Sequence, residues 1–63
     1  MIDKIERTAD GNVIVHGPHP AVSWPIVIVN PPEMVPDGDG FRHDPDEAIR
    51  QVVADVIAAA EAG

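Results

Sequence analysis

Cysteine is absent from this sequence, which excludes a disulfide framework and any zinc site built from thiolates alone. Aromatic side chains are almost absent, because the chain has one tryptophan, Trp24, one phenylalanine, Phe41, and no tyrosine. A chain of 63 residues buries only ~60% of the surface that its unfolded form exposes, so its core is small. Small domains often gain stability from a second subunit, and we therefore expect a homodimer or another protein partner.

Basic residues are also scarce, with four Lys and Arg against eleven acids and a net charge of −7. Binding of nucleic acid or of an anionic membrane needs clustered positive charge, so we expect neither activity. Six of the acids fall between Glu33 and Glu47, where Arg42 is the single Lys or Arg. We take four residues of this region as a candidate acidic contact surface for a basic partner: Glu33, Asp37, Asp39 and Asp46.

Long hydrophobic runs are missing, since no stretch approaches the ~20 apolar residues that a membrane span needs. Charged residues interrupt the segment 1–7, which is unlike a signal peptide. We therefore expect a cytoplasmic protein. The abundance of Ala, Val, Asp, Gly and Pro is typical of bacteria with GC-rich genomes and of their phages, and it favours a bacterial or phage accessory or structural protein.

The clearest pattern predicts a helix over residues 45–61. Asp44 can cap it, Pro45 suits its first turn, and Glu47 stands three residues after the cap, as in a capping box. Apolar residues then recur at helical intervals and form one stripe: Ile49, Val52, Val53, Val56, Ile57 and Ala60. Such a stripe requires a surface that covers it, and the upstream residues must supply that surface.

Residues 2–16 are predicted to form a hairpin around Asp10-Gly11, because this dipeptide is a strong signal for a two-residue turn. The resulting register places Arg7 opposite Ile14. One face would then hold Ile5 and Ile14, and the other Ile2, Val13 and Val15. A short amphipathic helix at the N-terminus is the alternative.

A third strand is predicted over residues 24–30, where β-branched residues predominate. Its alternation is unusual because both faces are apolar, with Trp24, Ile26 and Ile28 on one and Val27 and Val29 on the other. One helix covers only one face, so another subunit, a different protein or the proline-rich loop must cover the second. We therefore take Trp24, Val27 and Val29 as candidate interface residues.

The remaining segment, 31–43, is predicted to be an acidic loop rich in Pro and Gly, with a tight turn at Pro36-Asp37-Gly38. A minor hairpin, with Met34 and Val35 on one side and Phe41 on the other, is an alternative within it. The predicted fold is a single α+β domain over residues 1–63, in which a three-stranded, mostly antiparallel sheet carries one C-terminal helix on one face (β-β-β-α).

Metal binding finds little support in the sequence. Asp37 and Asp39 resemble ligands of a calcium loop, but the first ligand position then falls on Val35, which has no side-chain oxygen. The three histidines, His16, His19 and His43, would need to converge with Asp44 to hold zinc, and their spacing does not indicate this. We expect no bound metal or cofactor, with Asp37 and Asp39 as the weak candidates.

Catalytic signatures are missing too. Ser23 is the single serine, and it lacks the flanking glycines of a hydrolase nucleophile elbow. The sequence also contains no glycine-rich phosphate-binding loop. We therefore expect a non-enzymatic protein-protein interaction module that self-associates. The alternative is an acidic inhibitor that mimics nucleic acid and occupies the basic cleft of another protein.

Overall fold

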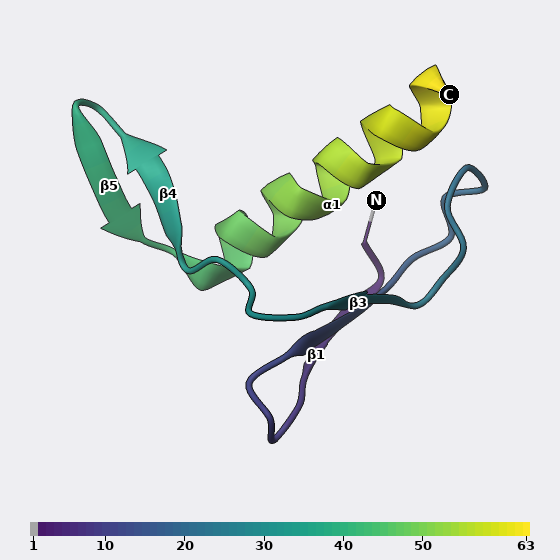
Figure 1. Cartoon of the computed structure of the whole chain (residues 1–63), viewed down its shortest axis with the longest axis horizontal. Helices are drawn as coiled ribbons and strands as arrows, with labels where there is room; N and C mark the ends of the chain where they lie inside the picture. Colours follow the sequence, from purple (N-terminus) through teal and green to yellow (C-terminus); the bar gives the residue numbers. More distant parts are fainter. Residues whose placement is uncertain (1) are drawn as a thin grey trace.

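A computed structural model describes residues 2–63 of the chain. It contains a three-stranded antiparallel sheet, a separate two-stranded hairpin and one C-terminal helix, which confirms the α+β class (Figure 1). The sheet has the order β1-β2-β3, and the hairpin consists of β4 and β5. The elements are β1 (Lys4–Arg7), β2 (Val13–His16), β3 (Ile26–Ile28), β4 (Met34–Asp37), β5 (Gly40–His43) and α1 (Pro45–Ala62).

Helix α1 begins where its capping residues predict. The side chain of Asp44 accepts a hydrogen bond from the backbone N–H of Glu47, and Pro45 occupies the first turn. The buried residues of the helix lie mostly one turn apart: Ala48, Ile49, Val53 and Ile57. Val56 is 38% exposed, so the stripe facing the sheet is narrower than the sequence predicted.

The register of the β1–β2 hairpin corrects the prediction by one residue. Arg7 lies opposite Val13, and a three-residue loop replaces the predicted two-residue turn, with Thr8 N donating to Asn12 O at 3.0 Å. Gly11 adopts a φ of 84°, which glycine tolerates at the last position of such a loop. Because a slip of one residue moves side chains to the opposite face, Ile5 joins Val15 on the core side.

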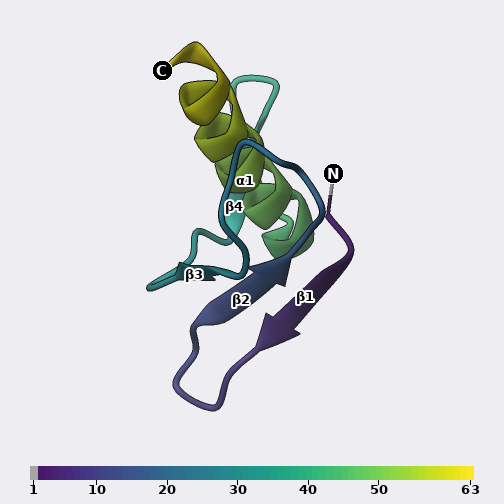
Figure 2. The ribbon, with the colours of Figure 1, turned by 90° about the vertical axis from the view of Figure 1, so that its right-hand side faces the viewer.

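The core lies between α1 and one face of the three-stranded sheet (Figure 2). Strand β2 is central, and its Val13 and Val15 are 1% and 0% exposed. The buried cluster consists of Val13, Val15, Ile49, Val53 and Ile57. Partly buried hydrophobic side chains surround it: Ile2, Ile5, Val22, Trp24, Ile26 and Ile28. The helix therefore covers the Ile26 and Ile28 side of β3.

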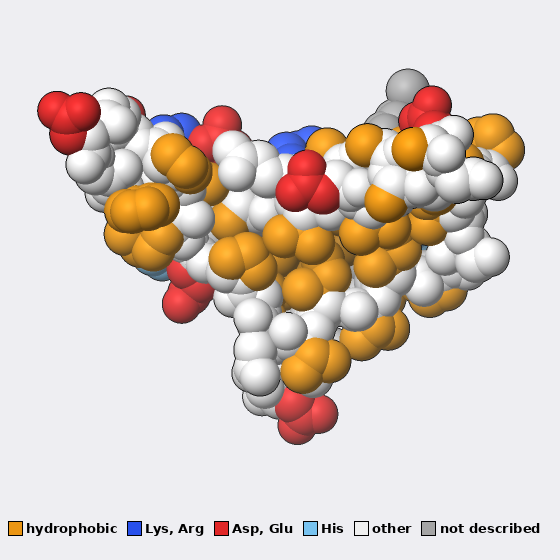
Figure 3. Space-filling view, turned by 45° about the horizontal axis from the view of Figure 1, so that its top comes forward, with side chains coloured by type: hydrophobic (Ala, Val, Ile, Leu, Met, Phe, Trp, Pro, Cys, Tyr) orange, Lys and Arg blue, Asp and Glu red, His pale blue; other side chains and the backbone are white. Residues whose placement is uncertain are grey.

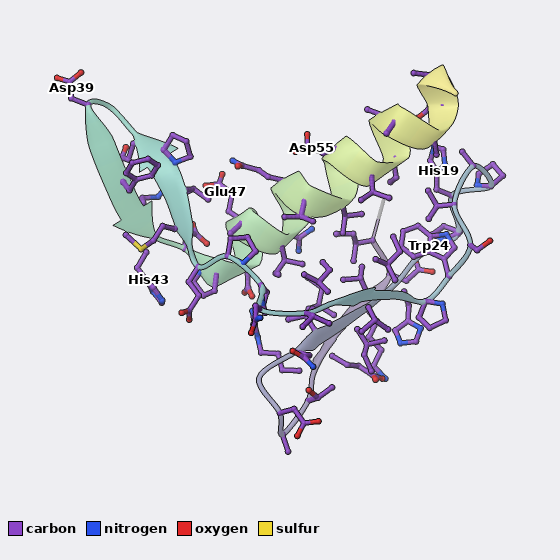
Figure 4. All side chains as sticks on the ribbon, viewed as in Figure 1. His19, Trp24, Asp39, His43, Glu47 and Asp55 are labelled. Carbon is purple, nitrogen blue, oxygen red and sulfur yellow. The ribbon has the colours of Figure 1, made fainter. Side chains whose placement is uncertain are left out.

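The loop between β2 and β3 reaches the C-terminal half of α1 (Figure 4). His19 Nε2 lies 3.3 Å from Glu61 Oε1 in the last turns of the helix. The indole N–H of Trp24 donates to the carbonyl oxygen of His19 at 3.0 Å. The part of the helix beyond the short strands is thus supported by this loop.

Residues 34–43 form a hairpin, where the sequence pattern predicts a loop with a minor hairpin as the alternative. The turn consists of Gly38 and Asp39, with Gly38 at a φ of 63°, as in a type II′ turn. The predicted tight turn at Pro36-Asp37-Gly38 is wrong, because Pro36 and Asp37 belong to β4. Asp37 and Gly40 close the turn, and Pro36 faces Phe41 in the next pair along the hairpin. At this position the N–H of a strand residue points away from its partner strand. Proline, which has no N–H, therefore costs no hydrogen bond between β4 and β5.

Candidate interaction surfaces

The sheet has a face that points away from α1, which we call the outer face. The strand register assigns it these residues: Lys4, Glu6, Ile14, His16 and Val27, with Val29 following just after β3. Val27 is 60% exposed and Val29 is 65% exposed, whereas Ile14 between the two neighbouring strands is half-buried. The outer face therefore leaves two valine side chains largely in water.

The charges on the outer face balance one another. Lys4 Nζ lies 2.6 Å from Glu6 Oε1, and the hydrogen bond and positive charge of Lys4 lower the pKa of Glu6. His16 Nε2 lies 3.8 Å from the other carboxylate oxygen of Glu6, and this nitrogen is buried without a hydrogen-bond partner among residues 2–63. The outer face is thus nearly neutral, although the whole chain carries a charge of −7.

Trp24 does not lie with Val27, although the strand pattern predicts Trp24, Val27 and Val29 as interface residues. Its side chain packs against the buried cluster on the helix side, and its indole N–H is bonded to His19. Its amphipathic ring is therefore used within the fold. Val27 remains on the outer face, and Val29 is exposed just beyond the end of β3.

A second exposed apolar surface lies on the β4–β5 hairpin, residues 34–43, which we call the arm. Its strand pairs put Met34 with His43 and Pro36 with Phe41 on the side away from α1. Phe41 is 70% exposed and Met34 is 49% exposed. The arm extends from the body beside the first turns of α1, and hydrophobic side chains gather on it (Figures 1 and 3).

The opposite side of the arm is attached to the helix. Val35 is 1% exposed, and β4 contacts α1. Arg42 donates to Glu47 and lies 3.5 Å from Asp44 and 3.9 Å from Asp37. One guanidinium therefore neutralises part of a three-carboxylate group and fixes the arm to the start of the helix. In the sequence, Arg42 is the single Lys or Arg among the six acids of residues 33–47. This isolated positive charge is the feature from which its pairing with several carboxylates could have been predicted.

The four candidate acidic contact residues do not form one continuous surface. Asp46, in the first turn of α1, pairs with Arg7 of β1 at 2.6 Å. Asp37 lies near Arg42, and Glu33 Oε1 lies 3.6 Å from His43 Nε2. Asp39 is at the tip of the arm (Figure 4). Asp37 and Asp39 therefore belong to the arm, and Glu33 directly precedes it. Asp46 instead forms an ion pair between α1 and β1.

The three histidines are separated from one another, since each lies near a different glutamate. His16 is near Glu6, His19 near Glu61 and His43 near Glu33. No group of three metal-ligating side chains occurs in the described part of the chain, and Asp37 and Asp39 stand on either side of Gly38 without a third ligand.

A hollow of about 520 Å³ lies between the β1–β2 turn and the segment after β3. Its lining is mixed in polarity and partly or fully exposed: Arg7, Thr8, Gly11, Asn12, Asn30, Pro31 and Glu33. The lining offers Thr8 as its single hydroxyl and no histidine, so it does not combine a nucleophile with an imidazole base.

Within residues 2–63, no helix is both long enough and apolar enough to span a membrane. The arrangement of exposed side chains offers two apolar surfaces of different charge, the neutral outer face and the acid-bordered arm. No family model matches the chain, and neither a curated protein nor a solved structure matches it.

Proposed function

We propose that this protein is a non-enzymatic interaction module that self-associates through the outer face of its sheet. The observation that carries the proposal is the exposure of Val27 and Val29, at 60% and 65%, beside Ile14. No other element among the described residues covers these side chains. They remain on the side of the sheet opposite α1, where a second molecule has access to them.

The free energy available from this contact is large for so small a chain. Fully burying one valine contributes ~1.5–3 kcal/mol, so burying the exposed parts of Val27 and Val29 contributes roughly 2–4 kcal/mol to each protomer. Single domains are stable by only ~5–15 kcal/mol. Association through the outer face would therefore stabilise the folded chain by a substantial fraction of its total.

The charge of the outer face favours a second copy as the occupant. Two molecules that each carry −7 repel one another at most surfaces. On the outer face, however, Lys4 offsets Glu6, and a two-fold axis that pairs the Lys4 of one copy with the Glu6 of the other would place opposite charges together. Self-association there avoids an excess of like charge.

The size of the face limits the strength of the complex. A standard interface takes ~800 Å² from each partner, which is about a fifth of the 4238 Å² accessible surface of this chain. Three short strands supply only part of that area, so the β1–β2 turn and the residues after β3 must contribute as well. We expect dissociation at micromolar concentrations.

Light scattering coupled to gel filtration tests the proposal. The wild-type chain should run as a dimer at high micromolar concentration, and its melting temperature should rise with protein concentration. Val27→Glu should give a folded monomer, and Phe41→Ser, which removes an exposed apolar side chain from the arm, is the matched control that should remain dimeric. A wild-type monomer of 6.7 kDa at hundreds of micromolar would disprove self-association.

The proposed setting is the cytoplasm of a bacterium or of a phage-infected cell, where the module acts as an accessory protein. Support for this setting comes from composition, namely the high Ala, Val, Asp, Gly and Pro content.

A further inference from the structure

The arm carries an exposed apolar surface that differs from the outer face in its charge. Its apolar side chains are Met34, Pro36 and Phe41, and Phe41 is the most exposed large hydrophobic side chain of the described residues, at 70%. Aromatic side chains of this kind often become the buried anchors of protein interfaces. An exposed phenylalanine on a well-paired hairpin therefore requires an explanation beyond folding.

The fold does not use Phe41 for its own packing. The arm is held to α1 from its opposite side, through buried Val35 and through the ion pairs of Arg42 with Glu47 and Asp44. Because attachment depends on these residues, the side bearing Phe41 is free in the chain itself. The hairpin thus presents this side chain on a supported element, which reduces the entropy lost on binding.

Carboxylates border the apolar side of the arm. Asp39 lies at its tip (Figure 4), and Glu33 precedes its first strand and lies 3.6 Å from His43 on this side, whereas Asp37 lies on the opposite side with Arg42. No Lys or Arg side chain of residues 33–47 offsets them on this side, because the single one, Arg42, lies against the carboxylates at the helix start. Figure 3 shows the resulting pattern of hydrophobic side chains with acidic ones at the end of the arm.

This charge argues against a second copy as the occupant of the arm. Two arms in contact through this side would bring together the Asp39 and Glu33 carboxylates of both copies. The neutral outer face of another copy offers only Lys4, which is already paired with Glu6. Like charges at an interface are unfavourable, so the occupant must supply positive charge.

We propose that the arm docks onto a basic protein segment, in which an apolar site receives Phe41 and neighbouring Lys or Arg side chains meet Asp39 and Glu33. Pro36 removes one N–H donor from the outer edge of β4, which disfavours strand addition along that edge. The proposed recognition uses side chains of the arm. This surface is separate from the outer face, and the inference does not depend on self-association.

Selection from a random 12-residue peptide library on the intact chain tests this inference, with Phe41→Ser protein as the counter-selection. We expect the retained peptides to combine Lys or Arg with an apolar residue, and their affinity to fall at least about tenfold on Phe41→Ser. Asp39→Asn and Glu33→Gln should each weaken binding several-fold. Salt should weaken the wild-type complex because it screens the rim charges.

Val27→Glu is the matched control, because it alters the outer face and should leave peptide affinity unchanged. Circular dichroism should show that each variant is folded, because the changes are at exposed positions. The inference is overturned if no peptide depends on Phe41, or if the dependent peptides show no excess of basic residues. It is also overturned if Phe41→Ser abolishes dimer formation, since the arm would then bind a second copy.

Discussion

The backbone N–H of Glu47 donates to Oδ1 of Asp44 at 3.1 Å, and this bond starts helix α1. Both side chains also contact Arg42 of β5. The cap of the helix is therefore connected to the attachment of the arm, so a change at Asp44 affects both.

Replacing Asp44 by alanine should lower the free energy of unfolding by ~1 kcal/mol, because a helix N–H loses its acceptor. The denaturant midpoints of variant and wild type measure this loss. Asp44→Asn retains a capping oxygen, so it should lose less and serves as the control. Equal midpoints for Asp44→Ala and wild type would contradict the assignment of the cap.

Core packing predicts a contrast between two apolar residues of α1. Ile49 is 0% exposed in the buried cluster, so Ile49→Val should cost ~0.5–1.5 kcal/mol by leaving a small cavity. Val56 is 38% exposed, and Val56→Ala should change stability by less than ~0.5 kcal/mol. Chemical denaturation of both variants checks the difference, and a larger loss at Val56 would place the helix stripe elsewhere.

The three-residue loop of the β1–β2 hairpin predicts that Gly11 is hard to replace. Its φ of 84° disfavours a side chain, so Gly11→Ala should cost ~1–2 kcal/mol although an added Cβ meets nothing within 4 Å. Gly40→Ala is the control, because Gly40 has the same open surroundings without a positive φ. Thermal melts of the pair test the loop, and similar losses would contradict it.

The ion pair on the outer face predicts a pH effect. Lys4 lowers the pKa of Glu6 below its ordinary value of 4.5, so ionised Glu6 favours the folded state. This contribution is fully present above pH 4.5 and is lost as the pH falls through the lowered pKa. A carbon-13 NMR titration of Lys4→Met should show the pKa of Glu6 moving up toward 4.5, whereas an unchanged pKa would exclude Lys4 as the cause.

Calcium should leave the melting temperature nearly unchanged. Asp37 and Asp39 are not joined by a third ligand in residues 2–63, and Arg42 lies 3.9 Å from Asp37. Scanning calorimetry with and without about 1 mM calcium, a range that weak protein sites cover, provides the measurement. A rise of several degrees that Asp39→Asn abolishes would reinstate a calcium site at the turn.

The candidate surfaces were only partly predictable from sequence. Alternation in residues 24–30 was enough to group Val27 with Val29, because side chains of a strand repeat every second residue. Trp24 was placed with them as an interface residue, yet its ring packs on the helix side. The exposure of Phe41 was missed, because it depends on the pairing of Phe41 with Pro36 across the arm.

The sequence by itself determined the α+β class and the start and extent of helix α1. Capping, the proline in the first turn and the repeat of apolar residues act within a few residues of one another, so a local pattern is sufficient to specify them. The register of β1 and β2, the pairing of β4 with β5 and the face of β3 that α1 covers were decided by the tertiary structure. These features depend on contacts between residues far apart in the chain, where a shift of one residue exchanges the buried and exposed faces.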